Sequence, residues 1–157
     1  MSRNKKNQSH EIMEEIIALM KKQVDPAQQT ILETFIRKYY KDTAEEDLSD
    51  NKAVNLYGAA LAHWNFAHLR KPNSSKVRLY NPQFEDHGWQ STHTVVEVVV
   101  EDMPFLVDSV RMALNARNLT THLVIHPVIN IGRDSSGHIS DVREYDDQAE
   151  NAGDEAL

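Results

Sequence analysis

The stretch THTVVEVVVEDMPFLVDSVRMALNARNLTTHLVIHPV, residues 92–128, decides the fold of this chain. It begins with β-branched residues at every second position, the pattern of a half-buried strand. These residues are Thr94, Val96, Val98 and Val100. Asp102 can then cap a helix whose first turn holds Pro104, a residue that has no N–H and needs none there. The stretch therefore predicts a strand that leads through an acidic turn into a helix.

The second half of the same stretch predicts an amphipathic helix and another strand. The helix has apolar residues spaced by three and four, which we call the apolar stripe and expect to face inward. The apolar stripe consists of Leu106, Val110, Ala113 and Leu114. Beyond Asn118 the period returns to two, with Leu123, Ile125, Ile129 and Ile131 on one face. The predicted unit is strand, helix, strand.

The chain before this unit reads as helices, and the chain after it ends in an acidic segment. Apolar periodicity predicts helices over residues 11–22, 26–39 and 49–69, with Asp25 capping the second and Ser49 starting the third. Residues 76–81 alternate and stop at Pro82, which predicts a strand at the edge of the sheet, paired antiparallel with the strand after Thr92. A further short strand is expected over residues 139–142. The predicted organisation is a helical amino-terminal subdomain (1–72), an α/β module (73–143) and an acidic disordered tail (144–157).

Several strings in this order resemble a known family. EDMPFLVDSV is similar to the first turn of an ACT domain, and DMPFLVDSVRMAL, HLVIHPV and GRDSSG resemble the amino-terminal region of the large bacterial NAD-specific glutamate dehydrogenases. AHWNFAHLR and VRLYNP extend the resemblance, which covers roughly residues 50–139. It implies an α+β fold: a helical subdomain followed by a partial ACT-like (ferredoxin-like) sheet, with mostly antiparallel strands and one βαβ unit. Because the second helix and last strand of an ACT domain are not found, residues 76–81 are expected to fill the edge of that last strand.

The resemblance also implies a function. The parent protein would be an NAD-dependent glutamate dehydrogenase, a cytoplasmic oxidoreductase that converts L-glutamate, NAD and water into 2-oxoglutarate, ammonia and NADH. This chain would be its amino-terminal regulatory or assembly region, without catalytic residues and without bound NAD. Its expected partners are an amino-acid effector, the rest of the dehydrogenase chain and further copies in a homo-oligomer. The alternative is a stand-alone amino-acid-sensing or protein-interaction module.

Small ligands of ACT domains bind near the turn between the first strand and the first helix. The corresponding residues here are Asp102, Met103, Pro104, Phe105, Leu106 and Asp108. A helix N-terminus offers free N–H groups to a carboxylate, and either aspartate can meet an ammonium group. Phe105, however, stands where the family pattern has glycine. The alternative is a purely structural turn, in which Asp102 is a cap, Pro104 starts the helix and Phe105 is an anchor in a core or interface.

Composition excludes several other classes of function. The net charge of −7 would repel nucleic acid and anionic membranes, and no segment approaches the roughly 18 apolar residues of a membrane span. Without cysteine there are no disulfides, thiolate nucleophiles or cysteine metal sites. His122 and His126 would be about 13 Å apart on a strand, too far to share one metal ion. We therefore expect neither a catalytic nor a metal site.

Overall fold

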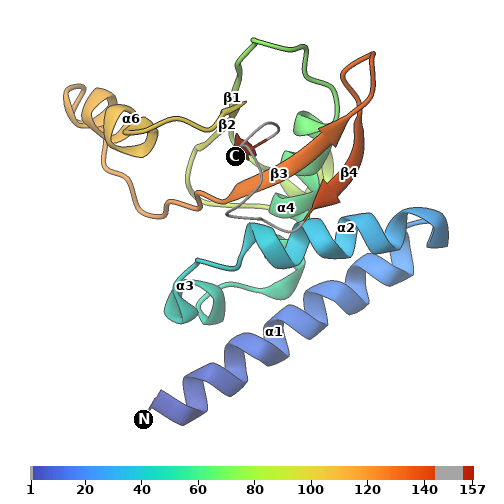
Figure 1. Cartoon of the computed structure of the whole chain (residues 1–157). Coiled ribbons are helices and arrows are strands. Elements are labelled where there is room, and N and C mark those ends of the chain that lie inside the picture. Colours follow the sequence, from blue (N-terminus) through green and yellow to red (C-terminus); the bar gives the residue numbers. More distant parts are fainter. Residues whose placement is uncertain (1, 144–153) are drawn as a thin grey trace.

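The computed structural model describes residues 2–143 and 154–157. The helices are α1 (Ser2–Gln23), α2 (Pro26–Tyr39), α3 (Glu45–Ser49), α4 (Ala53–Ala67), α5 (Phe84–His87) and α6 (Leu106–Asn115). The strands are β1 (Lys76–Tyr80), β2 (Val95–Glu101), β3 (Val128–Arg133), β4 (Ile139–Arg143) and β5 (Asp154–Ala156). Figure 1 shows α2 between α1 and the sheet, with α6 set apart from both. The predicted α+β class is confirmed.

The amino-terminal helices begin where their caps allow. Asp25 accepts a hydrogen bond from the Ala27 N–H at 2.9 Å, and Pro26 is the first residue of α2, as predicted. The prediction that Ser49 starts the third long helix is wrong. Its hydroxyl donates back to the Glu46 carbonyl at 3.1 Å, which places Ser49 at the end of α3. The long helix α4 begins at Ala53 instead.

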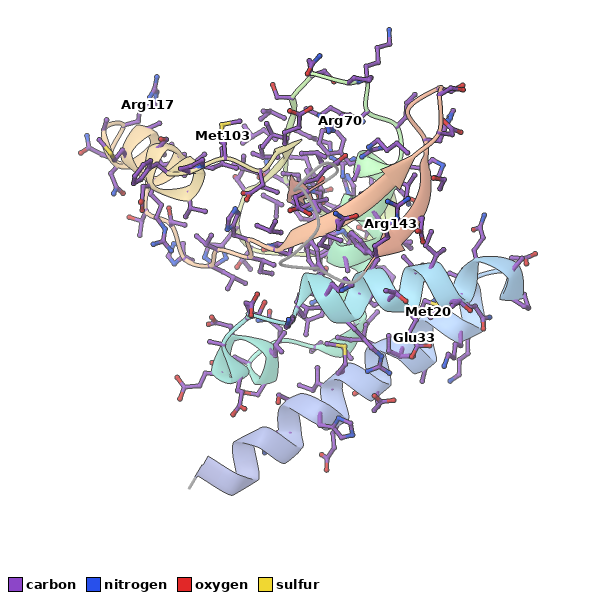
Figure 2. All side chains as sticks on the ribbon, in the orientation of Figure 1. Met20, Glu33, Arg70, Met103, Arg117 and Arg143 are labelled. Atoms are coloured by element: carbon purple, nitrogen blue, oxygen red, sulfur yellow. The ribbon has the colours of Figure 1, made fainter. Side chains whose placement is uncertain are left out.

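Helices and sheet share one hydrophobic core. Its fully buried members come from α1, α2, α4 and the sheet: Ile16, Met20, Phe35, Ile36, Ala60, Ala67 and Val99. In Figure 2 many side chains lie close together between the helices and the sheet, whereas those near Arg117, just after α6, lie away from the rest of the molecule. The helical segment therefore packs directly on the sheet, and the domain boundary at residue 72 stays a prediction. Within the described part of the chain, no helix has the length and apolarity needed to cross a lipid bilayer.

The five-stranded sheet has the order β1-β2-β5-β3-β4, and all neighbouring strands are antiparallel. Because β2 and β3 both run opposite to β5, they are parallel to each other, and α6 connects them. This is the predicted β–α–β unit, split by a strand between its two strands. β1 pairs with β2 from Lys76↔Val99 to Tyr80↔Val95, so the expectation that residues 76–81 lie beside the first strand is confirmed.

The central strand β5 overturns part of the predicted disordered tail. Asp154, Glu155 and Ala156 are buried between β2 and β3, and the Leu157 N–H donates to the Pro127 carbonyl at 3.2 Å. The composition of this segment predicted disorder, but backbone pairing on two sides and arginine partners for Glu155 hold it in place. Residues 144–153 of the predicted tail lie outside the described residues.

The two faces of β1 and β2 have different surroundings. Glu97 and Val99 point toward the helices and are buried. We call the other side the open face; its residues are Val77, Leu79, Val96, Val98 and Val100, which the pairing of β1 with β2 places together. Val77 is 67% exposed and Leu79 is 68% exposed. The open face is thus an apolar surface in contact with solvent.

Helix α6 corrects a second expectation. None of its residues is buried, so the apolar stripe does not face the core as predicted. The following strand also begins later than expected, at Val128 rather than soon after Asn118. The reason is that β5 pairs only with Val128–Asn130, which leaves residues 120–127 without a strand neighbour among the described residues. Figure 1 shows α6 held at the end of two extended connections.

Candidate functional site

The turn between β2 and α6 holds the residues that the resemblance singled out. Asp102, Met103, Pro104, Phe105 and Asp108 are exposed, and Leu106 is half-buried. The prediction that Asp102 caps the helix is wrong, because α6 begins at Leu106 and no side chain caps it. Asp102 instead donates its N–H to the Asp154 carbonyl at 3.1 Å, which ties the turn to β5.

Phe105 adopts the backbone conformation that a glycine at its position would favour. Its φ is 63°, in the left-handed region, and its side chain is 77% exposed. The resemblance places glycine here, so a bulky side chain occupies a backbone conformation that favours glycine. Phe105 is therefore not an anchor in the core of this chain.

The chemistry of this turn is limited. The first N–H groups of α6 have no side-chain cap and form the positive end of the helix dipole. Asp108 lies in that first turn and adds a negative charge beside those groups. The free N–H groups would attract a carboxylate ligand, but the negative charge of Asp108 would repel it. The turn alone is therefore a weak anion site.

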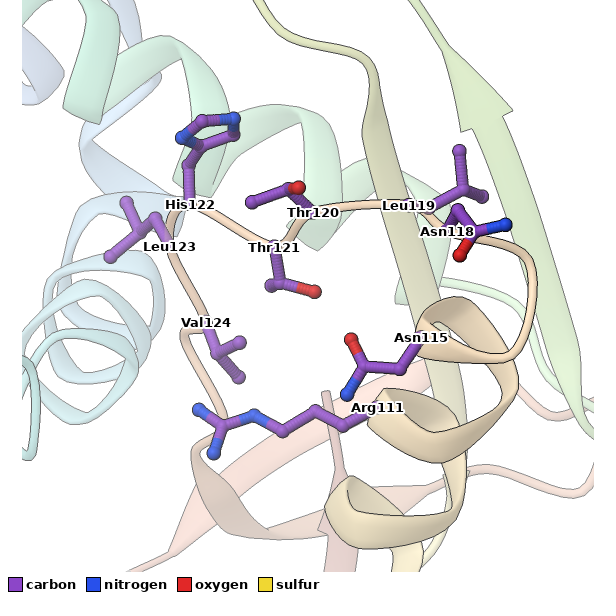
Figure 3. A pocket seen from close by; sticks show the side chains of 9 residues that line it. All are labelled: Arg111, Asn115, Asn118, Leu119, Thr120, Thr121, His122, Leu123 and Val124. Atoms are coloured by element: carbon purple, nitrogen blue, oxygen red, sulfur yellow. The ribbon is translucent and has the colours of Figure 1, made fainter.

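A cavity lies between α6 and residues 118–124, the segment that follows the helix. Its volume is about 570 Å³. It is lined by Arg111, Asn115, Asn118, Leu119, Thr120, Thr121, His122, Leu123 and Val124. Figure 3 shows the polar ends of Arg111, Asn115 and Thr121 turned into this space, while His122 points away from it. We call it the Arg111 cavity.

Arg111 also lines a second hollow of about 360 Å³ toward α2. Tyr39, Asp42, Thr43, Val107 and residues 124–127 form the rest of that hollow. No ion pair joins Arg111 to another residue in the described ranges. A guanidinium binds carboxylates through two parallel hydrogen bonds, so Arg111 is the natural partner for an acidic ligand. Sequence reasoning missed it, because a single arginine on an exposed helix carries no signal of its own.

The histidines do not assemble a metal site. His122 and His126 lie in an irregular segment, so the strand on which their predicted separation rested is absent. His122 instead contacts His93, with ring centroids 4.3 Å apart. Among residues 2–143 and 154–157, no group of three histidine, aspartate or glutamate side chains is placed to hold a metal ion.

The first of two buried polar clusters joins α4 to the sheet through Glu155. Arg133 donates from Nε to Glu155 Oε1 at 2.7 Å, and Arg70 Nη2 donates to the same oxygen at 3.0 Å. Arg133 also donates to the carbonyls of Ala67 and His68, which end α4. Burial by itself raises the pKa of Glu155, but hydrogen bonds from the two arginines bring it below its ordinary value. This cluster satisfies the negative end of a helix and a buried carboxylate together.

The second cluster holds His63 and Glu97. His63 Nε2 lies 3.2 Å from the Val98 carbonyl, which can only accept, so Nε2 carries the proton and Nδ1 accepts from the Tyr39 hydroxyl at 3.0 Å. Burial lowers the pKa of His63. Glu97 accepts from Tyr80 and Arg78 at 2.8 and 2.9 Å. These hydrogen bonds connect α2 and α4 to the sheet.

The helical layer, the split β–α–β unit and the glycine-like turn before α6 define an ACT-like module. The family model for the glutamate dehydrogenase ACT1 domain matches residues 35–157, and the chain belongs to this family. An NAD-specific glutamate dehydrogenase of Halomonas elongata is 40% identical over 132 residues, and one of Pseudomonas aeruginosa is 35% identical over 123 residues. These matches cover 84% and 78% of this chain but 8% of each relative. No solved structure matches the chain.

Proposed function

We propose that this chain is the amino-terminal regulatory region of an NAD-dependent glutamate dehydrogenase. The family match carries this proposal, since the relatives are NAD-specific glutamate dehydrogenases and the matched domain is of the ACT type. The whole enzyme would be a cytoplasmic oxidoreductase that turns L-glutamate, NAD and water into 2-oxoglutarate, ammonia and NADH. The module would shift that enzyme between states by binding an effector more tightly in one of them.

The strand-to-helix turn of this module does not fit NAD. A Rossmann-type dinucleotide site needs glycines there, so that the pyrophosphate can approach the backbone and the positive end of the helix. Phe105 and Asp108 occupy that turn instead. NAD is therefore assigned to the remainder of the enzyme.

The proposed effector is an amino acid with its carboxylate on Arg111. The guanidinium supplies the charge, while Asn115 and Thr121 supply hydrogen-bonding groups in the same cavity. The turn residues Asp102, Met103, Pro104, Phe105, Leu106 and Asp108 remain the second proposed site, and Asp108 lies one helical turn before Arg111. An amino acid whose ammonium group binds Asp108 and whose carboxylate binds Arg111 would connect the turn with the Arg111 cavity.

Thermal unfolding against a panel of amino acids tests the effector. A ligand at a hundredfold excess over its dissociation constant stabilises the folded state by about 2.7 kcal/mol. Arg111→Gln should abolish the shift, and Asp108→Asn should reduce it only if the turn takes part. Arg117→Gln is the control, because Arg117 lies in the turn just after α6, donates to the Ala113 carbonyl and does not line the cavity. A shift that survives in Arg111→Gln would reject the Arg111 cavity.

Assembly into a homo-oligomer is the second part of the proposal. β1 is an edge strand, and its outer side has no strand neighbour among the described residues. Unpaired edges tend to bind another strand, so two copies are expected to join there. Sedimentation velocity of the chain tests this: a dimer that Leu79→Pro converts to a monomer supports edge pairing, and a monomer at all concentrations rejects it.

A further inference from the structure

The second hollow beside Arg111 is lined by two parts of the chain that lie far apart in the sequence. Asp42 and Thr43 come from the turn after α2, whereas Val107 and Arg111 come from α6. We call this space the Asp42 hollow. Its volume of about 360 Å³ lies within the range of small-molecule sites, roughly 300–1,000 Å³. The space is therefore large enough to hold part of a small ligand.

The Asp42 hollow adjoins the Arg111 cavity. Arg111 and Val124 line both spaces. Figure 3 shows the Arg111 side chain extending from α6 until its guanidinium lies next to Val124. A ligand whose carboxylate binds this guanidinium can therefore place its other groups in either space.

Opposite charges line the two adjoining spaces. Among residues 2–143 and 154–157, the charged side chains of the lining are Arg111 and Asp42, and the other titratable ones are His122 and His126. Neither Arg111 nor Asp42 forms a side-chain hydrogen bond or ion pair with another described residue. Both charges are thus available to a ligand that carries a negative and a positive group.

The turn that carries Asp42 is fixed by the helical layer. The Thr43 N–H donates to the Tyr40 carbonyl at 3.1 Å. The Tyr40 side chain is buried, and its hydroxyl donates to the Leu56 carbonyl at 2.6 Å. The turn also follows the C-terminus of α2, where the negative end of the helix dipole favours a cation. Asp42 therefore offers a preformed position for an ammonium group.

The other wall of the hollow, which carries Arg111, is held by the sheet. Before α6, the Asp102 N–H donates to the Asp154 carbonyl at 3.1 Å. After α6, the Pro127 carbonyl accepts from the Leu157 N–H at 3.2 Å. Both bonds tie the connections of α6 to the segment of β5. The charges of the two walls are thus presented by supported elements.

We propose that Asp42 binds the ammonium group of the amino-acid effector whose carboxylate binds Arg111, so that the effector bridges the helical layer and α6. This inference rests on the proposed effector function and adds one residue to the same site. An ammonium group has three donors, and a charge-assisted hydrogen bond is roughly twice as strong as a neutral one. Asp42 then distinguishes amino acids from carboxylic acids that lack the ammonium group. Asp108 is not required for this discrimination.

Matched pairs of ligands test the role of Asp42. The probes are the proteinogenic L-amino acids and, for each one that raises the thermal midpoint of the chain, the L-2-hydroxy acid with the same side chain. The hydroxy acid keeps the carboxylate but has a hydroxyl in place of the ammonium group. Calorimetric titration gives the ratio of the two dissociation constants. We expect the original chain to bind the amino acid about tenfold more tightly or better.

Three substitutions show which carboxylate produces this ratio. Asp42→Asn should bring the ratio close to one, because it weakens binding of the amino acid and leaves the hydroxy acid unchanged. Asp50→Asn is the matched control, since Asp50 is an exposed aspartate that follows α3 and lines neither space. Asp50→Asn and Asp108→Asn should both keep the ratio of the original chain. A purely structural effect of Asp42→Asn would weaken both ligands together.

Several results would overturn the proposal. A ratio near one in the original chain, an unchanged ratio in Asp42→Asn, or an equal loss of both ligands there would remove Asp42 from the site. A ratio that falls in Asp108→Asn instead would place the ammonium group at the strand-to-helix turn. These three outcomes leave the proposed effector function standing. If no amino acid raises the midpoint of the original chain, the effector function fails and this inference fails with it.

Discussion

Arg133 and Glu155 form a two-point ion pair in the middle of the sheet. Nε of the arginine lies 2.7 Å from Oε1 of the glutamate, and Nη2 lies 2.8 Å from Oε2. The glutamate side chain is only 2% exposed. This pair positions β5 and the end of α4 at the same time.

Removing the charge of Glu155 should destabilise the fold strongly. Glu155→Gln leaves two buried guanidinium groups without their anion, and breaking a buried pair in this way costs about 3–5 kcal/mol. Urea denaturation measures the free energy of unfolding. Asp141→Asn is the control, because it breaks a guanidinium–carboxylate pair whose side chains are 54% and 59% exposed, worth about 0–1 kcal/mol. Equal effects of the two substitutions would contradict the role given to Glu155.

His63 should make the stability depend on pH in a mildly acidic window. Burial lowers its pKa in the folded state, while the unfolded chain keeps the ordinary value of 6.5. Below pH 6.5 the unfolded chain therefore binds a proton that the folded chain does not, and the free energy of unfolding falls as the pH falls. The loss stops once the pH is below the folded pKa of His63.

The comparison with His63→Gln isolates this effect. The variant should lose less stability than the original chain as the pH falls from 6.5 toward 5. Glu155 acts in a different window: its pKa is lowered from 4.5, so its contribution is present above that value and is lost at lower pH. Identical pH profiles of His63→Gln and the original chain would contradict the assignment to His63.

Phe105 offers a test of backbone strain. A residue with a side chain pays about 1–2 kcal/mol in the left-handed region, whereas glycine loses about 0.5–1 kcal/mol through its freer unfolded state. Phe105→Gly should therefore leave the thermal midpoint unchanged or raise it. Phe105→Val should lower the midpoint, because β-branched residues are poorly tolerated at positive φ. If Gly and Val variants behave alike, the turn does not hold this conformation in solution.

Gly58 is expected to be intolerant of any side chain. A Cβ added there would lie 2.4 Å from the Cβ of Trp89, which is buried against α4. Alanine is normally the better helix former by about 1 kcal/mol, but overpacking costs about 1–3 kcal/mol, so Gly58→Ala should lower the free energy of unfolding. Asn65→Ala on the exposed side of α4 should raise it slightly. A stabilising Gly58→Ala would show that Trp89 can move aside.

The local patterns predicted the elements whose stability is local. The alternation in residues 76–81 and 92–100 predicted two strands correctly, and Asp25 marked the start of α2 because its cap needs only the next turn. Strand β5 escaped prediction since its partners Arg70 and Arg133 lie far away in the sequence. A short acidic segment carries no sign of such partners.

The candidate site was predictable only in part. The spacing of the apolar stripe identified α6 and its apolar side, but periodicity does not say which surface that side contacts. Likewise, Arg111 gains its surroundings only when residues 118–124 return past the helix. The turn residues came from the resemblance, and their conformation could not be read from a sequence that has phenylalanine in place of glycine.

The position of β5 has a consequence for the order of folding. Among the described residues, β5 comes last along the sequence and is the central strand of the sheet, so the pairs β1–β2 and β3–β4 are joined only after residues 154–156 are available. During synthesis, which proceeds from the amino terminus, the helices and the two hairpins can form early. The edges of β2 and β3 that pair with β5 stay unpaired until β5 has been made. Because the pairing of β5 with β2 joins Val100 to Ala156, which lie far apart in the sequence, it is expected to be a slow step. Until β5 arrives, a nascent chain exposes two unpaired strand edges to other polypeptides.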